Sequence, residues 1–102
     1  TEPTMSGIHD LQRALLLLEN FSVTPSVCIN MYDINRDNTE RIMRFCKEKS
    51  IDVAGRIPFS TKVTEAMVKG KTIIEHSPES DVAKEIRNLW KSCKDSSYLG
   101  NR

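Results

Sequence analysis

Apolar residues recur at helical spacing near the start of the chain. A first helix is predicted over residues 8–18, where four apolar residues fall on one face: Ile8, Leu11, Leu15 and Leu18. Ser6 can cap the beginning of this helix, and Phe21 ends it. Ala14 and Leu16–Leu17 widen the apolar face, so the helix is expected to be largely buried.

Two apolar runs further along predict strands that are joined by a helix. Pro25–Ile29 is typical of a strand in a parallel sheet that is covered on both faces. A helix is predicted from Asp37 or Asn38 to Ser50, and a second strand over Ile51–Ile57. The connection of about twenty residues between the strands is long enough for a right-handed β-α-β crossover.

The C-terminal third of the sequence predicts two more helices. A short helix begins at Ser60 or Thr61 and ends at Gly70, and an extended connector follows over residues 71–77. Ser77-Pro78-Glu79 has the features of a helix start: a capping side chain, a proline and an acid. The inner face of this last helix is expected to hold Val82, Ile86, Leu89, Trp90 and Cys93. Residues 95–102 are expected to form a frayed tail.

The expected order is helix, strand, helix, strand, helix, helix, which is an α/β fold with a small parallel sheet. Two parallel strands are too few for an independent sheet. The 102 residues are therefore expected to be a single domain or a fragment of one, equivalent to the C-terminal portion of a larger doubly wound domain.

Composition and charge exclude several classes of function. The formal net charge is +1, and no aromatic residues interleave with basic ones, so nucleic acid is not an expected partner. The longest apolar run, Ala14–Leu18, is far shorter than the ~20 residues of a membrane-spanning helix. There is no secretory signal, and the three cysteines form no C-x-x-C pair, which favours reduced thiols in a cytoplasmic protein. His9 and His76 lack partners at metal-ligand spacing, so no metal site is expected.

Polar sequence follows both predicted strands. Asn30 and Asp33 come after the first strand, and Ile57, Pro58 and Phe59 lie at the end of the second. Because the strands are expected to be parallel, these residues should lie at one edge of the sheet, where open α/β sheets bind ligands. An asparagine amide can pair with the edge of a purine base. The alternative is that Asn30 and Asp33 form an Asx turn that leads into the next helix.

Four segments, in one collinear order, resemble the C-terminal part of a MinD/ParA-type P-loop ATPase: "TEPTMSGIHDLQRAL", "VCINMYDIN", "GRIPFSTKVTEAMVKGKTIIEHSPES" and "VAKEIRNLW". The subgroup they resemble most is the MinD-like ATPases with an inserted ferredoxin domain. The resemblance implies a P-loop NTPase-like fold and binding of ATP. It places Asn30 at the nucleotide base, Asp33 beside it as a second reader, and Ile57, Pro58 and Phe59 in the lining of the base pocket; the N-x-x-D spacing is compatible with a guanine reader as well as an adenine reader. Met31 stands where the subgroup has Lys, and Ser60 where many members have an acid.

Several motifs of these ATPases are absent from the sequence. The four glycines are scattered, so there is no P-loop, and no acidic residue ends a strand to hold Mg²⁺. No C-x-x-C-x-x-C series for an iron–sulfur cluster is present. The sequence therefore predicts an incomplete ATP site, with no catalytic residues and no activity of the chain alone. The alternative is a non-catalytic interaction module that pairs with the missing ATPase portion or, as a homodimer, with a second copy.

Overall fold

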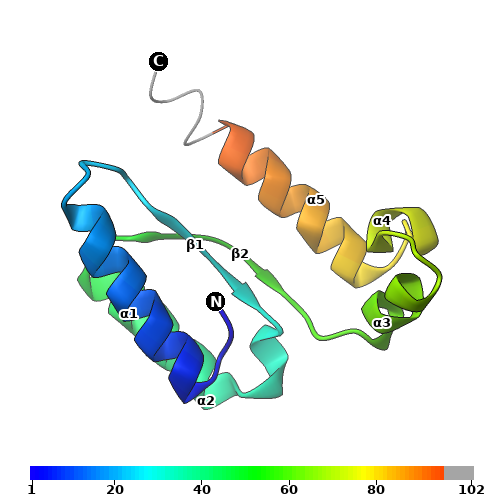
Figure 1. Ribbon diagram of the computed structural model, residues 1–102, viewed down its shortest axis with the longest axis horizontal. Coiled ribbons are helices and arrows are strands. Elements are labelled where there is room, and N and C mark those ends of the chain that lie inside the picture. The colour runs from blue at the N-terminus through cyan, green and yellow to red at the C-terminus, as the bar shows by residue number, and fades with distance from the viewer. Residues whose placement is uncertain (96–102) are drawn as a thin grey trace.

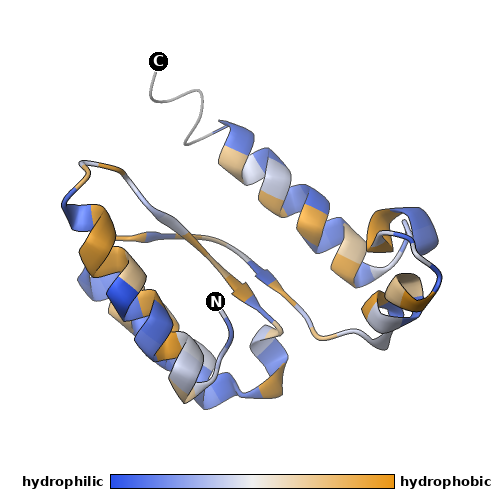
Figure 2. Cartoon of the chain, in the orientation of Figure 1, coloured by the Kyte–Doolittle hydropathy of each residue, from blue (hydrophilic) through white to orange (hydrophobic). Residues whose placement is uncertain are grey.

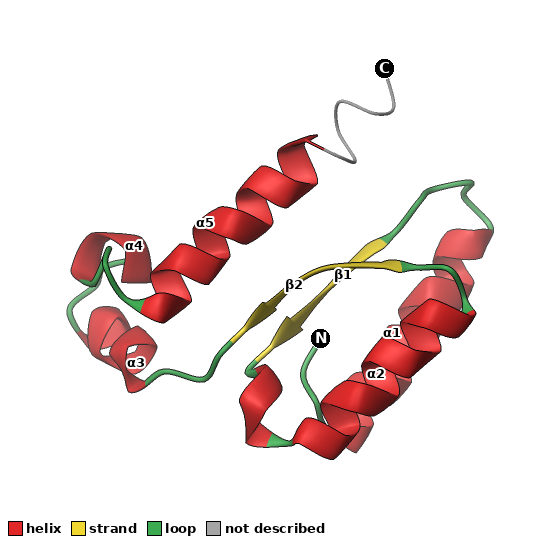
Figure 3. Ribbon diagram, turned by 180° about the vertical axis from the view of Figure 1, so that it is seen from behind, coloured by secondary structure: helices red, strands yellow, loops and turns green. Residues whose placement is uncertain are grey.

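The structure is a computed structural model that describes residues 1–95, and it places two parallel strands between two groups of helices (Figure 1). The elements in chain order are α1 (Met5–Glu19), β1 (Ser26–Asn30), the 3₁₀ turn η1 (Tyr32–Ile34), α2 (Arg36–Glu48), β2 (Asp52–Ile57), α3 (Thr61–Val68), α4 (Ile73–His76) and α5 (Asp81–Cys93). Seen from either side, α1 and α2 lie together on one side of the strands, and α3, α4 and α5 lie on the other (Figures 1 and 3). The predicted α/β class with a small parallel sheet is confirmed.

The strands pair in parallel with a register that brings their C-terminal ends together. Ser26 lies opposite Asp52 at one end, and Asn30 lies opposite Ile57 at the other. An irregularity between Val27 and Cys28 shifts the register by one residue on β2. The polar residues that follow the two strands therefore start from neighbouring positions.

The side chains of β1 alternate between the two faces of the sheet. Val27 and Ile29 are buried against α2, where they form one core cluster with Ile42 and Cys46. Figure 2 shows the corresponding hydrophobic colour on the strands and in stripes along the helices. Ile29 has no exposed surface at all, so it lies at the centre of this cluster.

A second core cluster lies on the opposite face of β2. Ile73, Val82 and Ala83 form it, and Ile57 packs against it from the end of the strand. Gly55 permits the close approach of α5, because a Cβ at this position would lie 3.3 Å from a methyl carbon of Leu89. Helices thus cover both faces of β2, as expected for a doubly wound fold.

The backbone of Thr1 extends the sheet beyond β1. The amino group of Thr1 donates to the carbonyl of Cys28 at 2.8 Å, and the N–H of Asn30 donates to the carbonyl of Thr1 at 2.7 Å. This is the bonding of one residue in a parallel ladder, and it lies on the edge of β1 that faces away from β2. Thr1 therefore occupies a third-strand position.

Two expectations for the first helix are wrong. Its cap is Thr4, whose hydroxyl accepts from the N–H of Gly7 at 2.9 Å, so Ser6 lies inside the helix. The helix is also less buried than its composition suggests, since Leu16 and Leu17 are 62% and 60% exposed. Leu15 is the one buried residue of α1, because α2 and the sheet cover just one side of the helix.

Two expectations for the C-terminal helices are also wrong. The predicted extended connector contains α4, which begins with a capping box between Thr72 and Glu75. The last helix begins at Asp81, because Ser80 rather than Ser77 supplies the cap, and its hydroxyl accepts from the N–H of Ala83.

The exposure of α5 also differs from its prediction. Trp90, expected at the core face, is 66% exposed. The predicted frayed tail lies, beyond Asp95, outside the described residues. Within residues 1–95 no helix has both the length and the apolar character needed to cross a bilayer.

The complete burial of Ile29 predicts a measurable loss of stability on a small truncation. Ile29→Val should lower the free energy of unfolding by about 1 kcal/mol, because it removes one buried methylene and leaves a small cavity. Ile34→Val is the matched control, since Ile34 is 49% exposed and should change stability by less than ~0.5 kcal/mol. Urea unfolding of both variants measures the difference, and equal effects would contradict the assignment of Ile29 to the centre of the core.

Candidate site at the carboxyl end of the sheet

The chain turns sharply at the end of β1. Met31 follows Asn30 and adopts a left-handed backbone conformation, with φ 52° and ψ 44°. A residue with a Cβ is strained in this region by roughly 1–2 kcal/mol. The surrounding contacts hold this turn, which directs Tyr32–Ile34 across the end of the sheet.

Hydrogen bonds from α2 fix the turn in place. The hydroxyl of Thr39 donates to the carbonyl of Tyr32 at 2.6 Å, and Thr39 is itself buried. The side chain of Asn35 accepts from the N–H of Asn38 at 3.0 Å and caps α2. The Asx-type cap of this helix is thus Asn35, which leaves the side chains of Asn30 and Asp33 for other contacts.

The carboxylate of Asp33 joins the two loops that follow the strands. Its Oδ1 accepts a hydrogen bond from the N–H of Phe59 at 2.8 Å. This contact holds the segment Ile57–Phe59 against the turn after β1, although the two partners are 26 residues apart in the chain. We refer to this hydrogen bond as the Asp33 latch.

All five residues predicted for the site gather at this edge of the sheet. Asn30, Asp33 and Phe59 are exposed, whereas Ile57 and Pro58 are half-buried. The side-chain amide of Asn30 has no hydrogen-bond partner within the described part of the chain, so its donors and acceptor face solvent. The arrangement offers an unengaged amide beside an apolar loop, a combination that suits a flat heterocyclic ligand.

Sequence reasoning missed a cationic group next to this site. The guanidinium carbons of Arg56 and Arg36 lie 5.0 Å and 5.9 Å from the centroid of the Tyr32 ring. Arg56 comes from β2 and Arg36 from the first turn of α2, so no spacing along the chain reveals that they share a partner. One signal in the sequence could have placed Arg56 near Tyr32. Side chains alternate between the two faces of a strand, and Arg56 projects to the same face of the sheet as its pairing partner Ile29.

Comparison with known proteins places the chain in a family. The sequence model of the 4Fe-4S iron sulfur cluster binding proteins of the NifH/frxC family matches residues 19–99, which include both strands and the whole of this edge. The chain belongs to the NifH/frxC family. This family is part of the P-loop NTPase superfamily, to which MinD and ParA also belong, and it binds nucleotide.

Two relatives of this NifH/frxC-family chain are informative. The nitrogenase iron protein of Methanococcus voltae is 34% identical over 56 residues, which cover 55% of the chain and 20% of that protein. An uncharacterised protein of Methanocaldococcus jannaschii is 23% identical over 92 residues, which cover 88% of the chain and 30% of that protein. The chain therefore spans between a fifth and a third of the length of these relatives. No solved structure gives a significant match.

The cysteines of the described residues do not fit the iron–sulfur cluster in the family's description. Cys46 is fully buried on the α2 side of the sheet, whereas Cys28 and Cys93 are half-buried elsewhere. Burial raises the pKa of the Cys28 and Cys46 thiols, which opposes the thiolate form that an iron–sulfur cluster requires. No group of three Cys, His, Asp or Glu side chains within residues 1–95 could hold a metal ion.

The latch predicts a local effect of removing its carboxylate. In Asp33→Ala the amide proton of Phe59 should exchange with solvent roughly tenfold faster, because an exposed hydrogen bond to a charged acceptor contributes about 1.4 kcal/mol. Asp37→Ala is the control, since Asp37 is also an exposed acid and lies in the first turn of α2. Amide hydrogen exchange followed by NMR measures both variants. Unchanged exchange at Phe59 in Asp33→Ala would show that the latch does not hold the loop.

Proposed function

We propose that this chain is the base-binding portion of a MinD-like P-loop ATPase, and that the carboxyl end of its sheet binds the adenine base of ATP. The observation that carries the proposal is the exposed amide of Asn30 beside the Ile57–Phe59 loop, with the Asp33 latch joining the two. Membership of a nucleotide-binding family supports it. The resemblance to MinD-like ATPases with an inserted ferredoxin domain supports the finer assignment.

Each residue has a distinct role in this proposal. Asn30 pairs its amide with the polar edge of the base, which presents both a donor and an acceptor. Ile57 and Pro58 form the apolar wall, and Phe59 contributes an exposed ring at its rim. Asp33 positions the wall through its latch while its second carboxylate oxygen remains available to the ligand.

The chain supplies base recognition without the chemistry of hydrolysis. Its sequence lacks the Gly-rich loop that holds a triphosphate, so ATP hydrolysis requires groups from outside these 102 residues. We propose that the chain acts together with a further ATPase portion. The relatives that it matches are three to five times longer than the matched segment, which is consistent with this view.

Adenosine tests base recognition directly, because it carries the base and no phosphate. Titration of adenosine into the chain should shift the NMR signals of Asn30 and Phe59 more than others, with weak affinity in the millimolar range. Asn30→Ala should weaken binding roughly tenfold, since it removes a bidentate contact that contributes ~1–3 kcal/mol.

Asn20→Ala is the matched control for this titration, since Asn20 is an exposed asparagine that ends α1 on a different element. It should bind adenosine as the unmodified chain does. The proposal fails if adenosine causes no shift at the carboxyl end of the sheet, or if Asn30→Ala and Asn20→Ala bind equally well.

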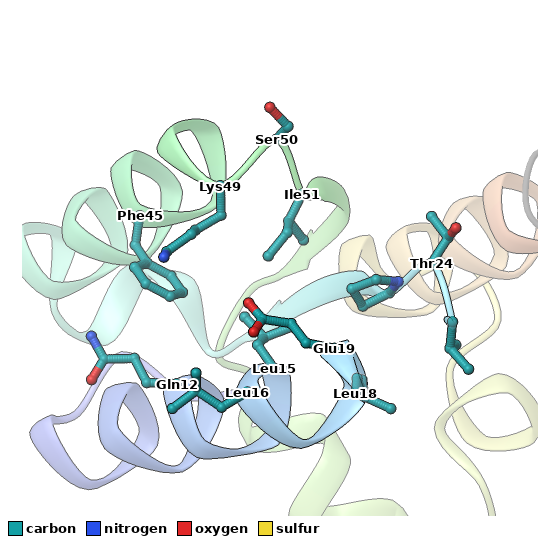
Figure 4. A pocket seen from close by; sticks show the side chains of 12 residues that line it. Gln12, Leu15, Leu16, Leu18, Glu19, Thr24, Phe45, Lys49, Ser50 and Ile51 are labelled. Carbon is teal, nitrogen blue, oxygen red and sulfur yellow. The ribbon is translucent and has the colours of Figure 1, made fainter. Parts of the chain in front are cut away.

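A second candidate function, an interaction module, is favoured by exposed apolar surface at the other end of the sheet. Leu16, Leu17, Phe21 and Val23 are each more than half exposed. Of these, Leu16 and Val23 line a hollow of about 490 Å³ between α1 and α2 (Figure 4). Its residues are Gln12, Leu15, Leu16, Leu18, Glu19, Val23, Thr24, Pro25, Phe45, Lys49, Ser50 and Ile51. A surface of this kind is typical of one that another polypeptide covers.

If the chain is an interaction module that pairs with a second copy, it should form dimers in solution. Light scattering should show a mass that rises with concentration toward that of a dimer, and Leu16→Lys, a change at an exposed residue that lines the hollow, should keep the chain monomeric. Met67→Lys is the control, because Met67 is 72% exposed on α3, away from this surface. A monomer at every concentration would exclude pairing with a second copy.

A further inference from the structure

The two arginines beside Tyr32 are held in place without using their hydrogen-bond donors. Arg56 and Arg36 contact the ring at 5.0 Å and 5.9 Å, distances typical of cation–π contacts. Such a contact engages the charge of each guanidinium and does not use its N–H groups as hydrogen-bond donors to a specific acceptor. Within residues 1–95 neither side chain forms a hydrogen bond or an ion pair.

The acids closest in sequence do not neutralise these charges. Asp33 accepts the hydrogen bond of the latch from Phe59, and Asp37 lies in the first turn of α2 without an ion pair to either arginine. Two guanidinium groups therefore share one ring and repel each other. An anion between or beside them would offset this repulsion and accept from donors that no group within residues 1–95 engages.

Tyr32, the ring that both arginines contact, is held by the core of the protein. Tyr32 packs against the core cluster of β1 and α2, and its carbonyl accepts from the buried hydroxyl of Thr39 at 2.6 Å. Arg36 starts α2 and Arg56 is near the end of β2, so both backbones belong to regular elements. Guanidinium groups held on such a platform lose less freedom when they bind than free side chains do.

We propose that Arg36 and Arg56, which both contact the Tyr32 ring, form an oxyanion site that takes a phosphoryl group. Arginine pairs with phosphate through two parallel N–H···O bonds, a geometry that lysine does not reproduce. The site is separate from base recognition at Asn30, because it rests on different side chains and on charge. The phosphoryl group comes either from a free phosphate compound or from a bound nucleotide.

Pyrophosphate is the probe for this site, since it carries the phosphoryl chemistry and no base. Titration of sodium pyrophosphate, followed by NMR at constant ionic strength, should shift the signals of Arg36, Arg56 and Tyr32. Arg36→Ala and Arg56→Ala should each weaken binding roughly tenfold, as expected for the loss of a charge-assisted pair. Arg36→Lys should also weaken it, because the charge remains but the bidentate geometry is lost.

Arg41→Ala is the control of equal charge. Arg41 lies on the same helix, is exposed, and contacts Met5 instead of Tyr32. If it weakens pyrophosphate binding as much as Arg56→Ala does, or if pyrophosphate shifts none of the three signals, the proposed site is wrong. Because all three arginines are exposed, their replacement should leave the fold intact, which urea unfolding checks.

Adenosine and ADP separate this proposal from base recognition. Arg56→Ala should leave adenosine binding unchanged, whereas Asn30→Ala should leave pyrophosphate binding unchanged. A loss of ADP affinity in Arg56→Ala would assign the phosphoryl group to a bound nucleotide, and unchanged ADP affinity would assign it to a free phosphate compound. A loss of adenosine binding in Arg56→Ala together with unchanged pyrophosphate binding would overturn the oxyanion site.

Discussion

The parallel pairing of β1 with β2 is the constraint on which the candidate site depends. It sets Asn30 directly beside Ile57, so the loops that follow the two strands leave the sheet side by side. The burial of Val27 and Ile29 fixes this register, because a slip of one residue would turn both side chains away from the core. A hydrogen bond of 2.8 Å from the backbone N–H of Phe59 to Oδ1 of Asp33 then joins the two loops.

The edge of the sheet could be predicted from the sequence, but the contacts within it could not. Apolar runs and a helical crossover indicated two parallel strands, and parallel strands end at one edge by geometry alone. The latch joins Asp33 to Phe59 across 26 residues, and Tyr32 gathers Arg36 and Arg56 from two elements. Such contacts depend on side-chain directions that a single sequence does not specify.

Other differences between sequence and structure have separate causes. Thr72 and Glu75 form a T-x-x-E capping box, which is a recognisable helix start in the sequence. Because α4 has only four residues, no helical repeat of apolar residues follows this start, and the segment was predicted to be an extended connector. The exposure of Leu16 and Leu17 has another origin, since spacing identifies apolar residues without identifying what covers them. Leu16 belongs to the surface that we propose another polypeptide covers.

The central claim is that the loops after β1 and β2 together contact the base of a nucleotide. Intermolecular NOEs between the adenine protons of bound ADP and the protein test this most directly. We expect NOEs from adenine H2 and H8 to the methyl groups of Ile57 and to the side chains of Asn30 and Phe59. NOEs confined to the leucines of α1, at the opposite end of the sheet, would contradict it.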